Sequence, residues 1–267
     1  MAITSLARIL GSMAMIVFAG AVAAGATGAF FSDTETSTGN TFTAGAIDLQ
    51  VDNESYVTNN EGVLVASPDN TWSLSDLTGK VFFSFIDLKP GDIGEDTISL
   101  HPGANNAWAC MAIETTSMPE NVVLETESGD PTPADGELQN YLNFAFWHDD
   151  GDNVFEQGEQ TFWVGGASTT FDGSWRAIAD STHGVALATT TNTYVGKAWC
   201  FGTLTPNPDD SGLDIDPVTR GTTGFTCVGS GNQNDAQTDG IVADVSFYAE
   251  QTRNNSTFTC SSLNNPI

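Results

Sequence analysis

A two-residue alternation of apolar and polar side chains most limits how this chain can fold. In residues 241–250 every odd-numbered position is apolar, whereas the even-numbered positions include Asp244, Ser246 and Glu250. Residues 47–52 repeat the alternation. Successive side chains of a β-strand point to opposite faces, so this pattern predicts strands with one buried face. No long window carries the 3.6-residue period of an amphipathic helix, which excludes a helical bundle.

Further short stretches rich in strand-forming residues are bounded by Gly, Pro, Asn and Asp, which favour turns. These stretches are residues 81–88, 97–100, 108–113, 121–126, 142–147, 161–164 and 194–201. Many short strands with turn-rich connections predict an all-β fold, an antiparallel Ig-like β-sandwich with long decorated loops. Residues 137–141 are expected to form a short helical turn, and residues 205–226 a long loop.

The amino-terminal stretch from Ile9 to Phe31 carries no charge and follows a single basic residue, Arg8. Small residues from Gly25 to Ala29 come after its apolar centre. This pattern predicts a helical signal peptide over residues 1–29, cut after Ala29. The alternative is an uncut membrane anchor, because the stretch is just long enough to span a bilayer. No basic stop-transfer cluster follows, so we favour cleavage and a secreted, extracellular or cell-surface protein without further membrane contact.

The charge balance excludes several kinds of partner. The 267 residues include 34 Asp and Glu but only 7 Lys and Arg, which gives a formal net charge of −27. Nucleic-acid binding needs a basic surface, and attraction to anionic lipid needs one as well. The apolar fraction of 40% argues against intrinsic disorder despite the charge. We therefore expect a folded acidic protein that binds neither nucleic acid nor membrane.

Four cysteines follow the signal segment: Cys110, Cys200, Cys227 and Cys260. None belongs to a Cys-x-x-Cys pair, so a zinc knuckle is not indicated. An even number of cysteines in an oxidising compartment predicts two disulfides. Three pairings are possible and the sequence does not decide among them. The pairing that we favour is Cys200 with Cys227 and Cys110 with Cys260.

Motifs for familiar enzyme chemistry are missing from the chain. The three histidines, His101, His148 and His183, lie far apart, and no His-Glu-x-x-His motif occurs. Nucleophilic Gly-x-Ser-x-Gly and phosphate-binding Gly-Lys-Ser/Thr motifs are absent too. The sequence therefore gives no catalytic residues, and we expect that the protein is not an enzyme.

One acidic loop, residues 148–159, resembles a twelve-residue calcium loop. Calcium takes six to eight oxygen ligands, and Asn153 at the sixth position tolerates the left-handed turn that such loops need. The departure is His148 at the first position, where Asp is expected; Asp149 is the substitute. The candidate ligands of a structural Ca²⁺ are Asp149, Asp150, Asp152, Val154 through its carbonyl, Glu156 and Glu159. The alternative is a solvated acidic turn between two strands.

Two motifs in the first third of the chain resemble the TasA/camelysin family of secreted proteins, whose signal peptides are of the SipW type. The first is the junction Ala29-Phe-Phe-Ser-Asp-Thr-Glu-Thr-Ser-Thr-Gly-Asn-Thr-Phe-Thr-Ala-Gly-Ala-Ile-Asp-Leu49. The second is the turn Asp87-Leu-Lys-Pro-Gly-Asp92. The resemblance implies a jelly-roll-like sandwich that polymerises outside the cell as a fibre or biofilm matrix. The half of the chain that carries the cysteines departs from the fibre-forming member.

In such fibres the mature amino-terminal segment adds as a strand to the next subunit. Here that segment is residues 30–44, followed by the sandwich domain, residues 45–267. Its candidate polymerisation residues are Phe30, Phe31, Thr34, Thr36 and Thr38, in which the aromatic pair provides an apolar anchor. Gly39 and Asn40 are the expected hinge. The resemblance thus implies a head-to-tail homopolymer, with an anchor subunit as a further candidate partner.

Three alternatives stay open at this stage. The segment 30–44 can be a polar tail without structure. The family includes proteins described as metallopeptidases, so a metal-dependent peptidase is an alternative, although the chain offers no recognisable zinc ligands. The third alternative is a monomeric, calcium-stabilised surface module that binds glycans or a partner.

Overall fold

The computed structural model describes residues 32–37, 41–43, 47–84, 87–127, 132, 134–230 and 233–264. The chain divides into two compact units, Met1–Phe31 and Ser32–Ile267, and every described residue belongs to the second unit. The expected signal helix, Phe30, Phe31, Thr38 and the expected hinge therefore lie outside the described residues. None of the described helices is long and apolar enough to cross a membrane.

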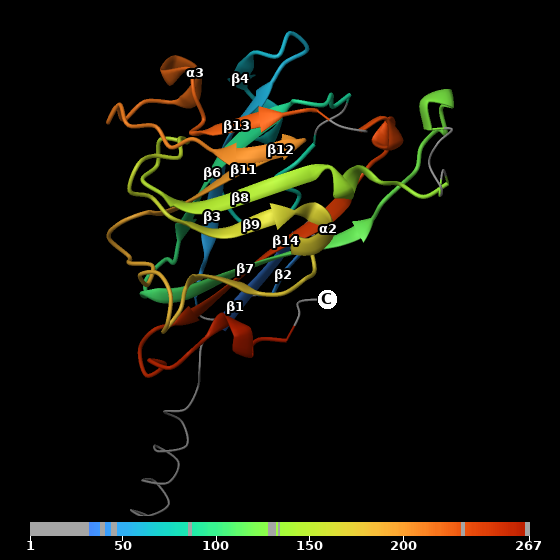
Figure 1. The fold of residues 1–267 in the computed structure, drawn as a ribbon. Helices are drawn as coiled ribbons and strands as arrows, with labels where there is room; N and C mark the ends of the chain where they lie inside the picture. The colour runs from blue at the N-terminus through green and yellow to red at the C-terminus, as the bar shows by residue number, and fades with distance from the viewer. Residues whose placement is uncertain are drawn as a thin grey trace, which may run out of the picture. The chain divides into compact units, whose positions relative to one another are not determined.

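The first sheet has five strands in the order β10-β7-β14-β1-β2, and neighbouring strands are antiparallel (Figure 1). Its strands are β1 (Ser32–Ser37), β2 (Thr41–Thr43), β7 (Ala107–Ser117), β10 (Arg176–Ala179) and β14 (Val242–Gln251). β14 lies in the middle, paired with β7 on one side and with β1 on the other.

The second sheet has seven strands, ordered β4-β3-β6-β11-β8-β9 with β5 also paired to β3. Its strands are β3 (Gln50–Thr58), β4 (Leu64–Ala66), β5 (Trp72–Ser75), β6 (Ile93–His101), β8 (Leu142–Asp149), β9 (Thr161–Gly166) and β11 (Thr193–Phe201). A separate hairpin joins β12 (Thr203–Pro206) to β13 (Phe225–Val228). The short helices are α2 (Ala167–Thr170) and α3 (Pro217–Arg220), with 3-10 turns at Pro68–Asn70, Glu125–Glu127, Leu138–Asn140, Gln233–Ala236 and Cys260–Ser262. The expected all-β, antiparallel sandwich is confirmed.

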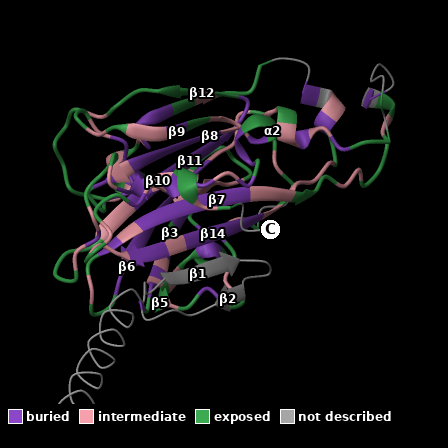
Figure 2. Cartoon of the chain, turned by 90° about the horizontal axis from the view of Figure 1, so that it is seen from below, coloured by how far each residue is buried: buried purple, intermediate pink, exposed green. Residues whose placement is uncertain are grey.

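The two large sheets share one hydrophobic core, which Figure 2 shows as buried strands in both sheets. Ile98 of β6 and Phe146 of β8 face this core from the second sheet, and Met111 of β7 and Phe247 of β14 face it from the first. All four side chains are fully buried. The apolar positions of the period-two alternation therefore face the partner sheet, as the sequence predicts.

The outer face of each sheet is covered by a segment that a disulfide holds in place. Cys110 of β7 is bonded to Cys260 of the carboxyl-terminal segment, and Cys200 of β11 is bonded to Cys227 of β13. Around the first bond packs a small cluster that includes Trp175. These are the two pairs that the sequence favoured, and the pairing is confirmed. The covering segments explain why several strands are buried on both faces.

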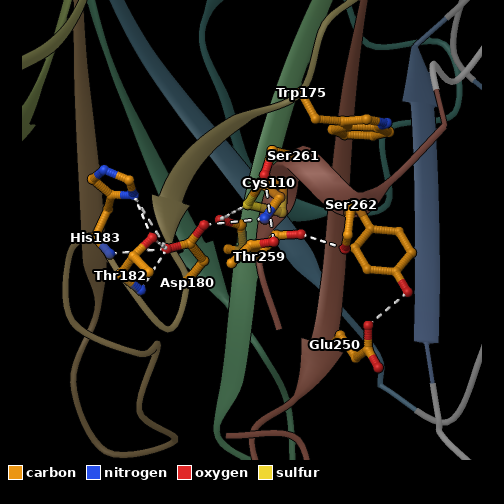
Figure 3. Close-up of a disulfide and its surroundings, with 12 residues drawn as sticks. Cys110, Trp175, Asp180, Thr182, His183, Glu250, Thr259, Ser261 and Ser262 are labelled. Atoms are coloured by element: carbon orange, nitrogen blue, oxygen red, sulfur yellow. Dashed lines mark hydrogen bonds and ion pairs between the residues drawn. A yellow bond between two sulfur atoms is a disulfide. The ribbon is translucent and has the colours of Figure 1, made fainter. Parts of the chain in front are cut away.

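Figure 3 shows how a carboxylate supports the first of these disulfides. Asp180 accepts hydrogen bonds from the backbone amides of Cys260 (3.1 Å), Thr182 (2.8 Å) and His183 (2.8 Å). Burial alone would raise the pKa of Asp180, but these hydrogen bonds outweigh it and hold that pKa below its usual value. Asp180 therefore keeps its negative charge, and the charged carboxylate holds the covering segment in place.

Three stretches differ from the sequence predictions. Residues 81–84 and 121–124 are not strands, and residues 205–226 are not a bare loop because they contain α3. The carbonyl of Phe82 accepts a hydrogen bond from the ammonium group of Lys197 at 3.3 Å instead of joining a ladder. The short helical turn expected near residues 137–141 is confirmed as Leu138–Asn140.

Candidate functional site

The acidic loop predicted as a calcium site connects β8 to β9 on the second sheet. Oxygen atoms of Asp149, Asp150 and Asp152 lie within 4.8 Å of one another, so this group could hold a metal ion. Gly151 (φ +116°) and Asn153 (φ +65°) adopt the left-handed backbone that folds the three carboxylates back toward one another. The left-handed turn expected at Asn153 is therefore present.

Asp149 is the most firmly held of these carboxylates. It accepts hydrogen bonds from Trp147 Nε1 (3.0 Å), Thr97 Oγ1 (2.9 Å) and the amide of Gly151 (3.0 Å). Burial raises the pKa of Asp149 to about 6, although these hydrogen bonds oppose the rise. A cation beside Asp149 would offset that cost of burial.

Arg220, from the end of α3, supplies positive charge to the same loop. Its guanidinium lies 2.5 Å from Asp152, 2.5 Å from Glu156 and 3.2 Å from Asp209. The guanidinium is almost wholly buried, with 2% of the side chain exposed. Burial disfavours its charge, but the hydrogen bonds to Asp152 and Glu156 more than compensate and raise the pKa of Arg220. Two of the predicted calcium ligands therefore form ion pairs within the protein.

Local sequence explains how Arg220 reaches this position. Asp216 caps the amino end of α3 by accepting hydrogen bonds from the amides of Val218 (3.1 Å) and Thr219 (3.0 Å). Gly221 (φ +79°) ends the helix in the left-handed conformation. Sequence reasoning took this region for a loop and missed Arg220, although the Asp-Pro start and Gly end of a helix were visible in it.

Glu159, the last predicted ligand, closes the loop because its side chain accepts hydrogen bonds from two backbone amides. Its Oε1 accepts from the amide of Asp150 at 3.1 Å, and its Oε2 accepts from the amide of Glu156 at 2.8 Å. Burial is the main cause that raises the pKa of Glu159 to about 8. Val154 is fully buried, and its amide donates to Asp152 at 2.9 Å. The structure thus groups only the first three predicted carboxylates as candidate ligands and gives Glu156 and Glu159 other contacts.

A further carboxylate contributes to this region without any signal in the sequence. Glu95 of β6 is fully buried, and neither of its carboxylate oxygens has a hydrogen-bond partner. Burial raises the pKa of Glu95 well above its usual value, and the charge of Asp149 is the next cause. A β-sheet brings the two residues near because β11 pairs with both β6 and β8. Only the strand order, which the sequence does not show, places Glu95 here.

The predicted polymerisation segment forms a strand in the first sheet. β1 pairs with β14 from Ser32 opposite Glu250 to Ser37 opposite Val245. β2 covers the other side of β1. Of the predicted residues, Thr34 and Thr36 lie in this strand, opposite Tyr248 and Ser246. The described residues of the segment are therefore paired within their own chain.

A cavity of about 910 Å³ opens between the two sheets. Its walls are mainly apolar and include Phe82, Phe83, Phe144, Trp199, Phe201 and Val245. The size is within the range of pockets that bind small molecules, about 300–1,000 Å³. The sequence gave no indication of it, because the residues that line it belong to both sheets and to the irregular segments between them.

One group of side chains has the composition of a catalytic triad but not its geometry. Ser99 Oγ lies 2.9 Å from His101 Nε2 and also donates to Asp52. In a catalytic triad the acid holds the other ring nitrogen of the histidine. Here Asp52 lies 3.9 Å from the same Nε2 atom. Among the described residues the groups that could hold a metal contain carboxylates alone.

No family model, no curated protein and no solved structure matches this chain. The contacts described above are therefore the basis of the functional proposal.

Proposed function

We propose that this protein is a secreted structural subunit of an extracellular fibre or matrix, and that neighbouring subunits exchange β1. The observation that carries the proposal is the position of β1 on the edge of β14. Without β1, the backbone of β14 from Val245 to Glu250 would have no partner on that side among the described strands. An uncovered strand edge is a template for a strand from another chain.

The β1 of a neighbour would offer the edge of β14 the same backbone hydrogen bonds as the chain's own β1. Exchange of an identical element between protomers is a low-cost route to assembly. Exchange in one direction from chain to chain builds a filament when the rotation between neighbouring subunits does not close a ring. The resemblance of residues 29–49 to the TasA/camelysin family supports the same interpretation.

Two further observations are compatible with an extracellular role. Both disulfides join segments that cover the sheets, and such bonds persist in oxidising compartments. The net charge of −27 keeps subunits apart at low ionic strength. Assembly should therefore be stronger in high salt, which screens the repulsion between subunits.

Calcium is the cation that we propose for the loop group Asp149, Asp150 and Asp152. The ligands are hard oxygen atoms, and Ca²⁺ tolerates irregular geometry and water as additional ligands. Its role there would be structural, because it would offset repulsion among carboxylates that Arg220 neutralises only in part. Titration with Ca²⁺ should raise the thermal unfolding midpoint, since binding to the native state stabilises it.

A cysteine pair tests strand exchange directly. Thr36 lies opposite Ser246, so the double variant Thr36→Cys/Ser246→Cys can form a disulfide between β1 and β14. Exchange predicts that oxidised filaments give a ladder of covalent multimers on a non-reducing gel. The single variant Thr36→Cys is the control for mispairing with native cysteines. Filaments whose oxidised chains all migrate as monomers would contradict the proposal.

A deletion provides an independent check on the same segment. Removal of residues 30–38 should abolish filaments in negative-stain micrographs, because no donor strand is left. The folded core should survive, since both disulfides and the shared core lie outside the segment. Filaments of unchanged abundance after the deletion would reject strand exchange.

The cavity between the sheets favours a second candidate, a monomeric module that binds an apolar ligand. This function predicts a monomer by light scattering at all salt concentrations. It also predicts that an environment-sensitive apolar dye is bound and that Ala243→Phe, which adds bulk to the cavity wall, reduces that binding. A dye signal that Ala243→Phe leaves unchanged would exclude the cavity as the binding site.

A further inference from the structure

A second group of carboxylates lies outside the loop 148–159. Glu120 and Glu127 follow β7, and Asp239 precedes β14, so two segments far apart in the sequence contribute to it. One oxygen from each residue lies within 4.8 Å of the others. Asp239 is also part of the cavity wall, together with Asn121 and Thr238. The sequence did not single out any of these three acidic residues.

Each of these three carboxylates has one buried oxygen that accepts no hydrogen bond from an N–H or hydroxyl group of the described residues. Glu127 is 1% exposed, and its Oε1 is buried without a hydrogen bond. Glu120 Oε1 and Asp239 Oδ1 are likewise buried and without hydrogen bonds. An unpaired buried carboxylate is strongly unfavourable, so native proteins neutralise such groups with a partner or an ion.

Among the described residues, no cationic side chain neutralises this group by an ion pair. Within the described part of the chain, none of the ion pairs involves Glu120, Glu127 or Asp239. The loop group differs in this respect, because Arg220 forms ion pairs with Asp152 and Glu156. Two acidic groups of one protein thus differ in whether the chain itself supplies the counter-charge.

The backbone holds the second oxygen of two of these carboxylates. Glu127 Oε2 accepts from the amide of Leu124, and Asp239 Oδ2 accepts from the amide of Glu137 at 2.5 Å. These bonds restrain the side chains of Glu127 and Asp239. Fixed ligands lose less conformational entropy when an ion binds.

The two segments are also joined to each other through their backbones. Gly240 donates its amide to the carbonyl of Pro119 at 2.9 Å, and Asn121 Nδ2 donates to the carbonyl of Thr238 at 2.6 Å. Thr238 adopts φ +79°, a left-handed conformation that is costly for a β-branched residue. The fold therefore maintains strained backbone beside Asp239.

We propose that Glu120, Glu127 and Asp239 bind a divalent cation, Ca²⁺, which ties residues 119–127 to residues 237–240 at the cavity wall. Ligand oxygens lie about 2.3–2.6 Å from Ca²⁺, so two ligands of one ion are at most about 5 Å apart. The observed limit of 4.8 Å satisfies this condition. Water molecules would complete the coordination.

Equilibrium dialysis of the full folded chain against Ca²⁺ at about pH 8, after chelator treatment, tests the proposal. Glu127→Gln and Asp239→Asn should each lose one bound Ca²⁺ per chain relative to the wild type. Asp69→Asn removes an exposed carboxylate from another part of the chain and is the matched control. Asp152→Asn separates the loop group, since it should leave binding by Glu127 and Asp239 intact.

Equal Ca²⁺ binding by Glu127→Gln, Asp239→Asn and Asp69→Asn would overturn the proposal. If these substitutions fail to fold, Glu120→Gln decides, because Glu120 is only half-buried. We expect Glu120→Gln to weaken Ca²⁺ binding. Wild-type affinity in Glu120→Gln would equally overturn the proposal. These assays need no filaments, so they are independent of strand exchange.

Discussion

Lys197 of β11 and Asp96 of β6 lie opposite each other on neighbouring strands of the second sheet and form an ion pair in which less than 2% of either side chain is exposed. The ammonium group also lies 3.8 Å from the centre of the Phe83 ring and donates to the carbonyl of Phe82. Burial lowers the pKa of Lys197, and the charge of Asp96 opposes that change. Asn53 Nδ2 contacts the other oxygen of Asp96 at 3.4 Å. This polar cluster anchors the irregular segment 81–84 to the sandwich core.

Removal of one member of this ion pair should be far more damaging than removal of both. Lys197→Met leaves Asp96 buried without its counter-charge, so we expect a loss of about 3–5 kcal/mol in the free energy of unfolding. The double variant Lys197→Met/Asp96→Leu should recover most of that loss, because neither charge is then left buried. Urea denaturation measures both values. A double variant as unstable as the single one would show that the pair is not coupled in this way.

Arg220→Met should destabilise the protein by a similar mechanism, and calcium should reverse part of the loss. The substitution leaves Asp152 and Glu156 without their buried partner, so we expect a loss of about 3–5 kcal/mol. A divalent cation would then provide the missing positive charge. Thermal unfolding with and without Ca²⁺ measures the effect, and the midpoint of the variant should rise more than that of the wild type.

The exposed ion pair between Lys89 and Asp87 provides the control for Arg220→Met. Lys89→Met should cost less than about 1 kcal/mol, because exposed ion pairs contribute little. It should also leave the response to Ca²⁺ unchanged. An Arg220→Met variant that behaves like Lys89→Met would show that the guanidinium does not hold the loop together.

Stability should fall as the pH rises from about 4 to about 8 in the absence of divalent cations. The pKa values of Asp149 (about 6) and Glu159 (about 8) are raised in the folded state, so folded protein binds more protons than unfolded protein in this range. The stabilisation is complete below the unfolded pKa values, near 4, and is lost as the pH passes the folded values. Below about pH 4 the lowered pKa of Asp180 acts in the opposite direction.

Thermal unfolding in chelator across this pH range tests the expectation. Glu159→Gln should flatten the fall between about pH 6 and pH 8, because it removes the group that titrates there. Asp69→Asn, an exposed substitution, should leave the profile unchanged. Stability that rises steadily from pH 4 to pH 8 in the wild type would show that Asp149 and Glu159 are not protonated in the folded protein.

The alternation of apolar and polar residues predicted where strands occur but not which strands are neighbours in a sheet. Residues 241–250 and 194–201 were predicted closely because each carries a long run of alternating or β-favouring residues, observed as β14 and β11. Strand order and register depend on contacts between distant segments, which one sequence does not show. Gly196 is an example: a Cβ atom there would collide with the indole of Trp147 on β8, a contact that local pattern gave no reason to expect.

The candidate sites were predictable to the extent that their residues are close together in sequence. Asp149, Asp150 and Asp152 lie in one turn, so their spacing was enough to indicate a cation site. Arg220 and Glu95 reach the same region through α3 and β6, and only the folded chain brings them there. The same limit applies to Asp239, which lies more than a hundred residues after its partners.

The two disulfides should contribute unequally to stability. A cross-link stabilises chiefly by limiting the unfolded chain, and its effect grows with the length of the loop it closes. Cys200 and Cys227 are separated by 27 positions, for which the chain-entropy relation gives about 3–4 kcal/mol. Cys110 and Cys260 are separated by 150 positions, which gives about 5 kcal/mol. Replacement of both cysteines of a pair by alanine should therefore lower the free energy of unfolding more for Cys110–Cys260 than for Cys200–Cys227. Urea denaturation measures both losses.

Local protection should distinguish the two bonds as well. Loss of the Cys200–Cys227 bond should expose Trp147, because Phe225 of the β12–β13 hairpin packs against its indole. Loss of the Cys110–Cys260 bond should instead loosen the segment around Trp175 and leave Trp147 protected. Hydrogen exchange followed by mass spectrometry resolves the two regions. If both variants lost protection over the same residues, the disulfides would not act as separate clamps on the outer faces of the two sheets.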